Sequence, residues 1–126
     1  MPNQKQVENL KQGPAAWNAW RAHNPQARIL LNSTDFSYAD LSGADLHEAF
    51  MGKANLNGAV LYQANLKHAH LTGADLRGAY MRWVRLNGTR LEGANLTGAV
   101  VTESRLNLAR SLEGAILPNG RELPRL

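Results

Sequence analysis

Large apolar residues recur at every fifth position through the middle of the chain. From Ala39 to Leu106 the sequence divides into consecutive five-residue blocks, beginning ADLSG, ADLHE, AFMGK and ANLNG. The third residue of each block is large and apolar, and the first is nearly always small. A helical face recurs about every 3.6 residues and a strand face about every 2, so a fivefold period requires a chain that turns a corner in every block. Internal repeats of this kind indicate a solenoid.

The repeated block resembles the pentapeptide-repeat family. The motif A(D/N)LxG is seen as ADLSG at residues 39–43 and as ANLTG at residues 94–98. This resemblance covers residues 31–118 and implies an all-β solenoid, a right-handed quadrilateral β-helix with four blocks per coil. The repeats would then make a little over four coils. The family resemblance implies no particular activity, because most of its members have none known.

The resemblance also implies which side chains form the core. The third residue of each block should point inward and stack on the residue four blocks away, and the small first residue should face the interior beside it. The predicted core ladder consists of Phe36, Leu41, Leu46, Met51, Leu56, Leu61, Leu66, Leu71, Leu76, Met81, Leu86, Leu91, Leu96, Val101 and Leu106. Glycine is frequent at the fifth position, where a corner with positive φ would suit it.

Residues 1–30 and 119–126 flank the repeats and are expected to close the ends of the solenoid, because exposed strand edges invite association. Residues 6–11 are weakly helical, Gly13-Pro14 interrupts them, and Pro14 suits the first turn of a second helix. Residues 16–21, AWNAWR, resemble the leaders that precede the repeats in some bacterial members of the family. We expect a helical cap in which Trp17 or Trp20 covers the first coil; the alternative is a partner-binding helix.

The repeat loses its phase near the C-terminal end. Ser111 stands where the period predicts a core residue, and Leu112 resumes the pattern one residue late. A one-residue bulge near Arg110-Ser111 is the simplest account. The sequence Pro118-Asn119-Gly120 then predicts a turn, after which residues 119–126 form a tail that either folds back over the last coil or stays loose.

Composition excludes several functional classes. The 126 residues contain no cysteine, which rules out disulfides and thiolate chemistry, and no apolar run of membrane-spanning length. We find no signal peptide and expect a cytoplasmic protein without membrane contact. The formal net charge is +4, but residues 31–76 carry −3 and residues 77–118 carry +3. The family members best known by function imitate duplex DNA and inhibit gyrase with a long acidic rod, so the neutral solenoid disfavours that activity here.

One face of the predicted coil is unusually apolar. Folding the blocks four to a coil brings large outward side chains onto one wall, where the family usually places small or polar residues: Val60, Tyr62, Tyr80, Trp83 and Val100. A contiguous exposed apolar patch commonly marks an interface. We therefore predict a non-enzymatic scaffold that binds a protein of unknown identity through this face, or pairs with a second copy. The alternative is that a terminus covers the patch.

A second candidate surface is basic. Arg85 and Arg105 are expected in one outward column and Arg90 and Arg110 in the column of the next face. With Arg82 nearby, they would form a basic strip beside the aromatic residues. Arginines interleaved with aromatic side chains can bind nucleic acid, although a short strip on a neutral solenoid favours an ordinary solvated face.

Catalytic and metal chemistry have little support in the sequence. The acidic residues occur mainly where the repeat itself expects Asp or Asn, so Asp40, Asp45 and Asp75 are predicted to bond backbone at turns. An outward metal site could be formed by Glu48, His68 and His70. A corner separates the two histidines, however, and no fourth ligand is evident. We expect no catalytic residue, no metal and no cofactor.

Overall fold

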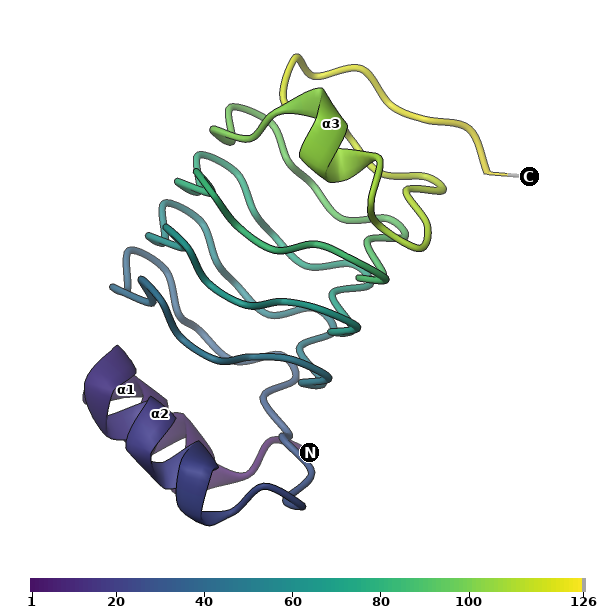
Figure 1. Cartoon of the computed structure of the whole chain (residues 1–126). Coiled ribbons are helices and arrows are strands. Elements are labelled where there is room, and N and C mark those ends of the chain that lie inside the picture. Colours follow the sequence, from purple (N-terminus) through teal and green to yellow (C-terminus); the bar gives the residue numbers. More distant parts are fainter. Residues whose placement is uncertain (126) are drawn as a thin grey trace.

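The chain winds into a stack of square coils with two helices at one end (Figure 1). The computed structural model describes residues 1–125. Isolated parallel bridges join residues one coil apart, such as Asp40 with Val60 and Val60 with Tyr80. Backbone hydrogen bonds follow the same register, because the Leu41 N–H donates to the Val60 carbonyl at 2.8 Å and the Leu61 N–H to the Tyr80 carbonyl at 2.7 Å. The predicted right-handed quadrilateral β-helix is confirmed.

The bridged residues form four outward columns, and each column defines one wall. Wall A carries Asp35, Asn55, Asp75, Asn95 and Ile116. Wall B carries Asp40, Val60, Tyr80 and Val100. Wall C carries Asp45, Asn65 and Arg85, and wall D carries Leu30, Phe50, His70, Arg90 and Ser111.

The core lies inside the square and consists of the predicted ladder, except that Val101 is only partly buried. From Leu31 to Leu96 every third-position residue is at most 1% exposed. At roughly 1.5–3 kcal/mol for each large side chain removed from water, this ladder is the main favourable contribution to folding. Leu106 is also buried, but it reaches the core from a short helix, α3 (Glu103–Leu106), where the repeat predicted another block. Thr102 begins this helix by accepting a hydrogen bond from the Arg105 N–H at 3.3 Å.

Each corner is a tight turn whose fifth-position residue has a positive φ. At one corner the Ala44 N–H donates to the Leu41 carbonyl, and Gly43 between them has φ 68°. A positive φ at that position is the signature of a type II turn. Trp83 occupies the equivalent position with φ 61° although it is not glycine. The turn therefore holds a large aromatic side chain at a corner of the coil.

The N-terminal helices α1 (Gln4–Lys11) and α2 (Pro14–His23) lie against the first coil. Their side chains bond to backbone groups that would otherwise meet a preceding coil. Asn18 acts like a peptide group, because its Nδ2 donates to the Gly43 carbonyl at 2.9 Å and its Oδ1 accepts from the Asp45 N–H at 2.7 Å. Gln6 does the same on wall D, with 2.8 Å bonds to the Arg28 carbonyl and the Leu30 N–H.

Trp17, rather than Trp20, covers the first coil. Trp17 is fully buried and its Nε1 donates to the Asp45 carbonyl at 2.8 Å. Trp20 is only partly buried and packs against Trp17, with ring centroids 5.3 Å apart. The aromatic ring that seals the end of the core therefore also supplies one of its edge hydrogen bonds.

The C-terminal end contains the expected bulge. Arg110 donates its N–H to the Thr89 carbonyl while the Ser111 carbonyl accepts from the Leu91 N–H, so two residues oppose Arg90. Beyond it the tail folds back along wall A as an antiparallel partner, with Ile116 bridged to Glu122. Leu126, the last residue of the predicted tail, lies outside the described residues. Within residues 1–125 no helix is long and apolar enough to cross a membrane.

Candidate interaction surfaces

Wall B carries the apolar residues that the sequence placed on one face. Val60, Tyr80 and Val100 are successive members of its bridged column. Tyr80, Trp83 and Val100 are 37%, 49% and 51% exposed, respectively. Tyr62 is half-buried and stacks on Tyr80, with ring centroids 6.2 Å apart and an interplanar angle of 25°. The five side chains therefore lie on one wall and its corner, and their exposure increases toward the C-terminal end.

A cavity of about 340 Å³ lies at the upper end of this wall. Its floor includes the core residue Met81, and Trp83 and Val100 line it. The remaining lining residues are Arg82, Val101, Thr102 and Arg105. The wall thus offers a mainly apolar hollow beside its two most exposed apolar side chains.

Two arginines flank the exposed tryptophan. The Arg82 and Arg105 guanidinium carbons lie 5.6 Å and 5.1 Å from the Trp83 ring centroid, which is within the range of a cation–π interaction. Arg105 also donates from Nη1 to the Val84 carbonyl at 2.7 Å. Neither arginine forms an ion pair with a carboxylate in residues 1–125. The two guanidinium groups therefore contact the Trp83 ring and remain able to bind an acidic group of a partner.

Both termini bond to other parts of the solenoid. The N-terminal helices contact the first coil, at the end far from Val100, and the tail pairs with wall A. Figure 1 shows α1 and α2 at one end of the stack and α3 at the other. The exposure of Tyr80, Trp83 and Val100 agrees with this arrangement. In the described chain neither terminus covers these three side chains.

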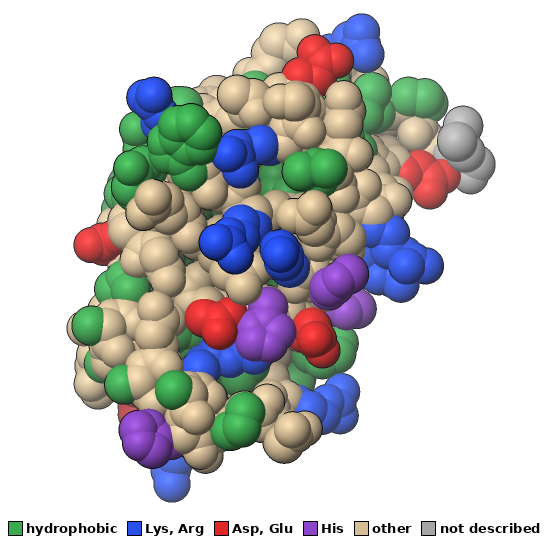
Figure 2. All heavy atoms as spheres, viewed as in Figure 1, with side chains coloured by type: hydrophobic (Ala, Val, Ile, Leu, Met, Phe, Trp, Pro, Cys, Tyr) green, Lys and Arg blue, Asp and Glu red, His purple; other side chains and the backbone are tan. Residues whose placement is uncertain are grey.

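The predicted basic strip is divided between walls. Arg85 belongs to wall C and Arg90 to wall D, while Arg82 and Arg105 gather at Trp83. Figure 2 shows Lys and Arg side chains near the middle of the viewed face and a group of hydrophobic side chains at its upper left. The arginines therefore do not form one continuous groove of the kind that tracks a nucleic-acid backbone.

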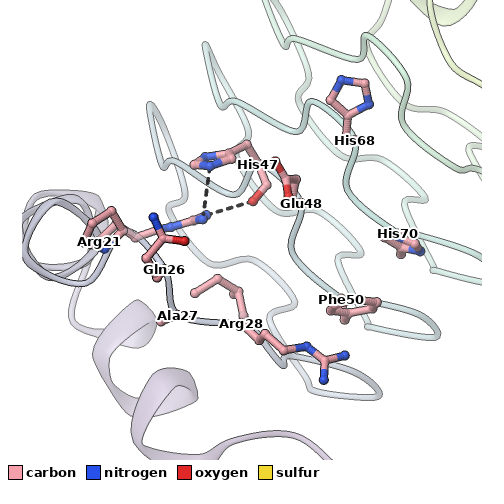
Figure 3. Close-up of a pocket in the computed structure, with 11 residues that line it drawn as sticks. Arg21, Gln26, Ala27, Arg28, His47, Glu48, Phe50, His68 and His70 are labelled. Atoms are coloured by element: carbon pink, nitrogen blue, oxygen red, sulfur yellow. Dashed lines mark hydrogen bonds between the residues drawn. The ribbon is translucent and has the colours of Figure 1, made fainter.

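A second cavity, of about 620 Å³, lies between the N-terminal cap and walls C and D. Figure 3 shows Arg21, Arg28, His47, Phe50 and His70 among its lining residues. The His70 ring stacks on Phe50 at 4.6 Å, and the Arg28 guanidinium lies 5.3 Å from the same Phe50 ring. Sequence reasoning missed this cavity because it depends on how the cap docks, and no periodic pattern specifies that.

Arg21 joins the cap to the edge of this cavity. Its Nη1 donates to the Asp45 carbonyl at 2.9 Å and to the His47 carbonyl at 3.0 Å, and the side chain is 6% exposed. Burial lowers the pKa of Arg21, and the nearby carboxylates of Asp45 and Glu48 oppose that shift. Arginine stays protonated even so, so this charge serves the fold.

Glu48, His68 and His70 line the same cavity, but they are not arranged as metal ligands. His70 is stacked on Phe50, and His68 points elsewhere in Figure 3. Among residues 1–125 no three His, Cys, Asp or Glu side chains are grouped so that they could hold a metal ion.

The repeat carboxylates bond to their own turns, as predicted. Asp40 accepts from the Ser42 N–H at 3.0 Å, and Asp75 accepts from the Arg77 side chain at 2.8 and 2.9 Å. Hydrogen bonding to Arg77 lowers the pKa of Asp75, and hydrogen bonding to Ser42 lowers the pKa of Asp40. These carboxylates are held ionised by the turns, the opposite of what a general acid needs.

Comparison with known proteins agrees with this architecture. Residues 28–61, 39–78 and 74–110 match pentapeptide repeats, in eight copies. The structure is similar to that of HetL, a pentapeptide repeat protein involved in heterocyst differentiation regulation from the cyanobacterium Nostoc sp. strain PCC 7120, with 40% identity and a TM-score of 0.69. That similarity covers 73% of this chain but only 42% of HetL.

Two further structures are similar over a comparable part of the chain. A pentapeptide repeat protein from the Arabidopsis thaliana thylakoid lumen is 32% identical over 68% of this chain and 62% of its own, with a TM-score of 0.38. Rfr23 from the cyanobacterium Cyanothece 51142 is 26% identical over 78% of this chain and 67% of its own, with a TM-score of 0.43. No protein with curated function matches significantly. The repeats matched over residues 28–110 place this chain in the pentapeptide-repeat family.

Proposed function

We propose that this protein is a non-enzymatic scaffold that binds another protein through wall B. The contact face consists of Val60, Tyr62, Tyr80, Trp83 and Val100. The observation that carries the proposal is the adjacent exposure of Tyr80, Trp83 and Val100 at 37%, 49% and 51%. Single exposed apolar side chains are ordinary, but a contiguous patch beside a cavity is typical of an interface.

The fold itself does not require an apolar wall B. Wall A uses Asp and Asn at the same block position and makes the same parallel bridges. Replacing those residues by Val and Tyr therefore adds exposed apolar surface without adding backbone pairing. Solenoids commonly bind partners through extended faces of this kind, and aromatic side chains commonly dominate the binding energy.

The structural roles of the polar residues are also consistent with a scaffold. The repeat carboxylates bond to turn N–H groups, and the buried Arg21 bonds to backbone carbonyls of the first coil. HetL, which shares this fold over part of its length, is described as involved in regulation. That description supports a binding role here only by analogy of fold.

The test is capture of a partner by the wild-type protein and by a Tyr80→Ser/Trp83→Ser variant. Tyr38→Ser is a matched control, because Tyr38 is 74% exposed and lies at a different corner with a positive φ of 59°, close to the 61° of Trp83. We expect the double variant to keep its melting temperature and to bind at least ~30-fold more weakly, as aromatic anchors do. Tyr38→Ser should bind normally.

The salt dependence of binding distinguishes this proposal from nucleic-acid binding by the arginines. An apolar contact should survive moderate salt, whereas a phosphate contact should weaken steeply. A double variant that loses stability but captures the partner as well as the wild type does would refute the proposed face.

A further inference from the structure

We propose that the partner presents an extended acidic segment that adds as a strand to the upper edge of wall B. This inference rests on the proposed function of wall B and names the chemistry of its partner. Three features converge at this edge: unpaired backbone groups, an apolar cavity and two arginines without a carboxylate partner.

The backbone at the top of wall B is ready to pair. One coil lower, the Ala79 carbonyl accepts from the Val100 N–H and the Met81 N–H donates to the Val100 carbonyl, both at 2.9 Å. The corresponding groups of the next coil are the Ala99 carbonyl and the Val101 N–H, and neither has a hydrogen-bond partner in residues 1–125. Ala99 is 7% exposed and Val101 is partly buried, and an unpaired strand edge of this kind is a template for an added strand.

The protein's own tail shows that such an edge accepts an extended segment. On wall A, Ala115 and Leu117 hold the same block positions as Ala99 and Val101. The tail satisfies them, because the Leu123 N–H donates to the Ala115 carbonyl and the Leu117 N–H donates to the Arg121 carbonyl, both at 2.8 Å. Wall B offers the same pair of groups without an occupant.

Walls C and D have a less regular edge at this end. On wall C the short helix α3 replaces the last block. On wall D the bulge at Arg110 and Ser111 interrupts the register, since two residues there oppose one. On wall B, by contrast, the bridged residues stay twenty positions apart up to the last bridge, between Tyr80 and Val100.

The side chains next to this edge favour an acidic segment with an apolar centre. A residue paired above Val100 would point outward, as Val100 does, next to the 340 Å³ cavity that Trp83 and Met81 line. Its neighbours along the segment would lie near Arg82 and Arg105, which flank Trp83 and lack carboxylate partners. Glu103, at the start of α3, is the acidic residue adjoining Val101. Two guanidinium groups against one carboxylate favour a negatively charged partner.

The experiment measures binding of a fluorescein-labelled peptide, EEVLVEE, by fluorescence anisotropy. The control peptides are KKVLVKK and an EEVLVEE whose three central amides are N-methylated, which removes the donors that a strand needs. We expect EEVLVEE to bind at least ~10-fold more tightly than KKVLVKK, because like charges across an interface are strongly unfavourable. N-methylation should weaken binding by ~10-fold, the upper range for one lost hydrogen bond.

Protein variants locate the peptide. Arg82→Gln/Arg105→Gln should weaken EEVLVEE binding, whereas Arg77→Gln, on wall A, should not. Amide hydrogen exchange supplies an independent readout: the Val101 amide should exchange fast in the free protein and slowly with EEVLVEE bound, while the Met81 amide is protected in both states.

Equal binding of the two charged peptides, unchanged binding after N-methylation, or a Val101 amide already protected in the free protein would overturn strand addition. If EEVLVEE fails to bind while Tyr80→Ser/Trp83→Ser still abolishes partner capture, wall B is an interface but its partner is not an acidic strand. Displacement of a bound partner by an oligonucleotide instead of EEVLVEE would assign the surface to nucleic acid.

Discussion

Replacement of Arg21 by methionine tests how the N-terminal end of the solenoid is closed. Arg21 is 6% exposed, and its Nη1 donates to the Asp45 and His47 carbonyls at 2.9 and 3.0 Å. Methionine matches the aliphatic part of the side chain but donates no hydrogen bond. The Asp45 carbonyl keeps the Trp17 indole as a partner, whereas the His47 carbonyl loses its bond.

The structure sets the size of this effect. A hydrogen bond from a charged donor contributes about 1.5–3 kcal/mol, and a buried carbonyl left without a partner costs about 1–3 kcal/mol. The desolvation that lowers the pKa of Arg21 offsets part of this, because methionine carries no charge to bury. We expect a net loss of ~2 kcal/mol in the free energy of unfolding, which for a domain of this size lowers the melting temperature by roughly 6–10 °C.

The assay is thermal unfolding followed by circular dichroism, with Arg28→Met as the matched control. Arg28 lines the same cavity, but its side chain is exposed and contacts the Phe50 ring, whose centroid lies 5.3 Å from the guanidinium. That cation–π contact contributes about 0.5–1 kcal/mol at most. If Arg21→Met melts within about 2 °C of the wild type, or no lower than Arg28→Met, the buried guanidinium does not close the coil and the reasoning is wrong.

Three further predictions test the coil. Leu66→Ala should cost ~2–5 kcal/mol in urea unfolding, because Leu66 is fully buried; an unchanged midpoint would remove the assigned register. Gly88→Ala should destabilise more than Gly78→Ala, since both glycines have positive φ but an added Cβ at Gly88 would meet the His68 ring; equal melting temperatures would contradict this. A hydrogen bond lowers the folded-state pKa of Asp75, so its stabilisation is present above about pH 4 and lost as pH falls through that lowered pKa; Asp75→Asn should flatten the acid limb, and an unchanged limb would refute it.

The core could be predicted from the sequence because the repeat specifies it many times over. Each block places one large apolar residue at its centre. Assigning the wrong register to one block would therefore contradict the register of the blocks before and after it. The bulge was predictable for the same reason: Ser111 breaks a period that Leu112 resumes, and backbone pairing around Arg90 absorbs one extra residue. The position of the wall B side chains follows from the same period.

The ends could not be predicted in detail because no period reaches them. Nothing in the spacing of Gln6, Asn18 and Arg21 indicates that their side chains would bond to the backbone of the first coil. α3 replaced a predicted block because Thr102 and Glu103 start a helical turn as readily as a corner. The cavity beside Phe50 exists only because the cap docks there.

The two ends of the solenoid are closed by different means, and that difference bears on function. At the N-terminal end, side chains of both helices bond to the first coil, and Trp17 covers the core. At the C-terminal end the tail closes wall A, but Val101 is only partly buried and the top of wall B keeps unpaired backbone groups. A solenoid that needed only to avoid edge association would close both ends alike. The open edge lies at the same end as Trp83 and Val100, the most exposed apolar residues of wall B. A partner strand bound to wall B would therefore also close its upper edge, as the tail already closes the upper edge of wall A.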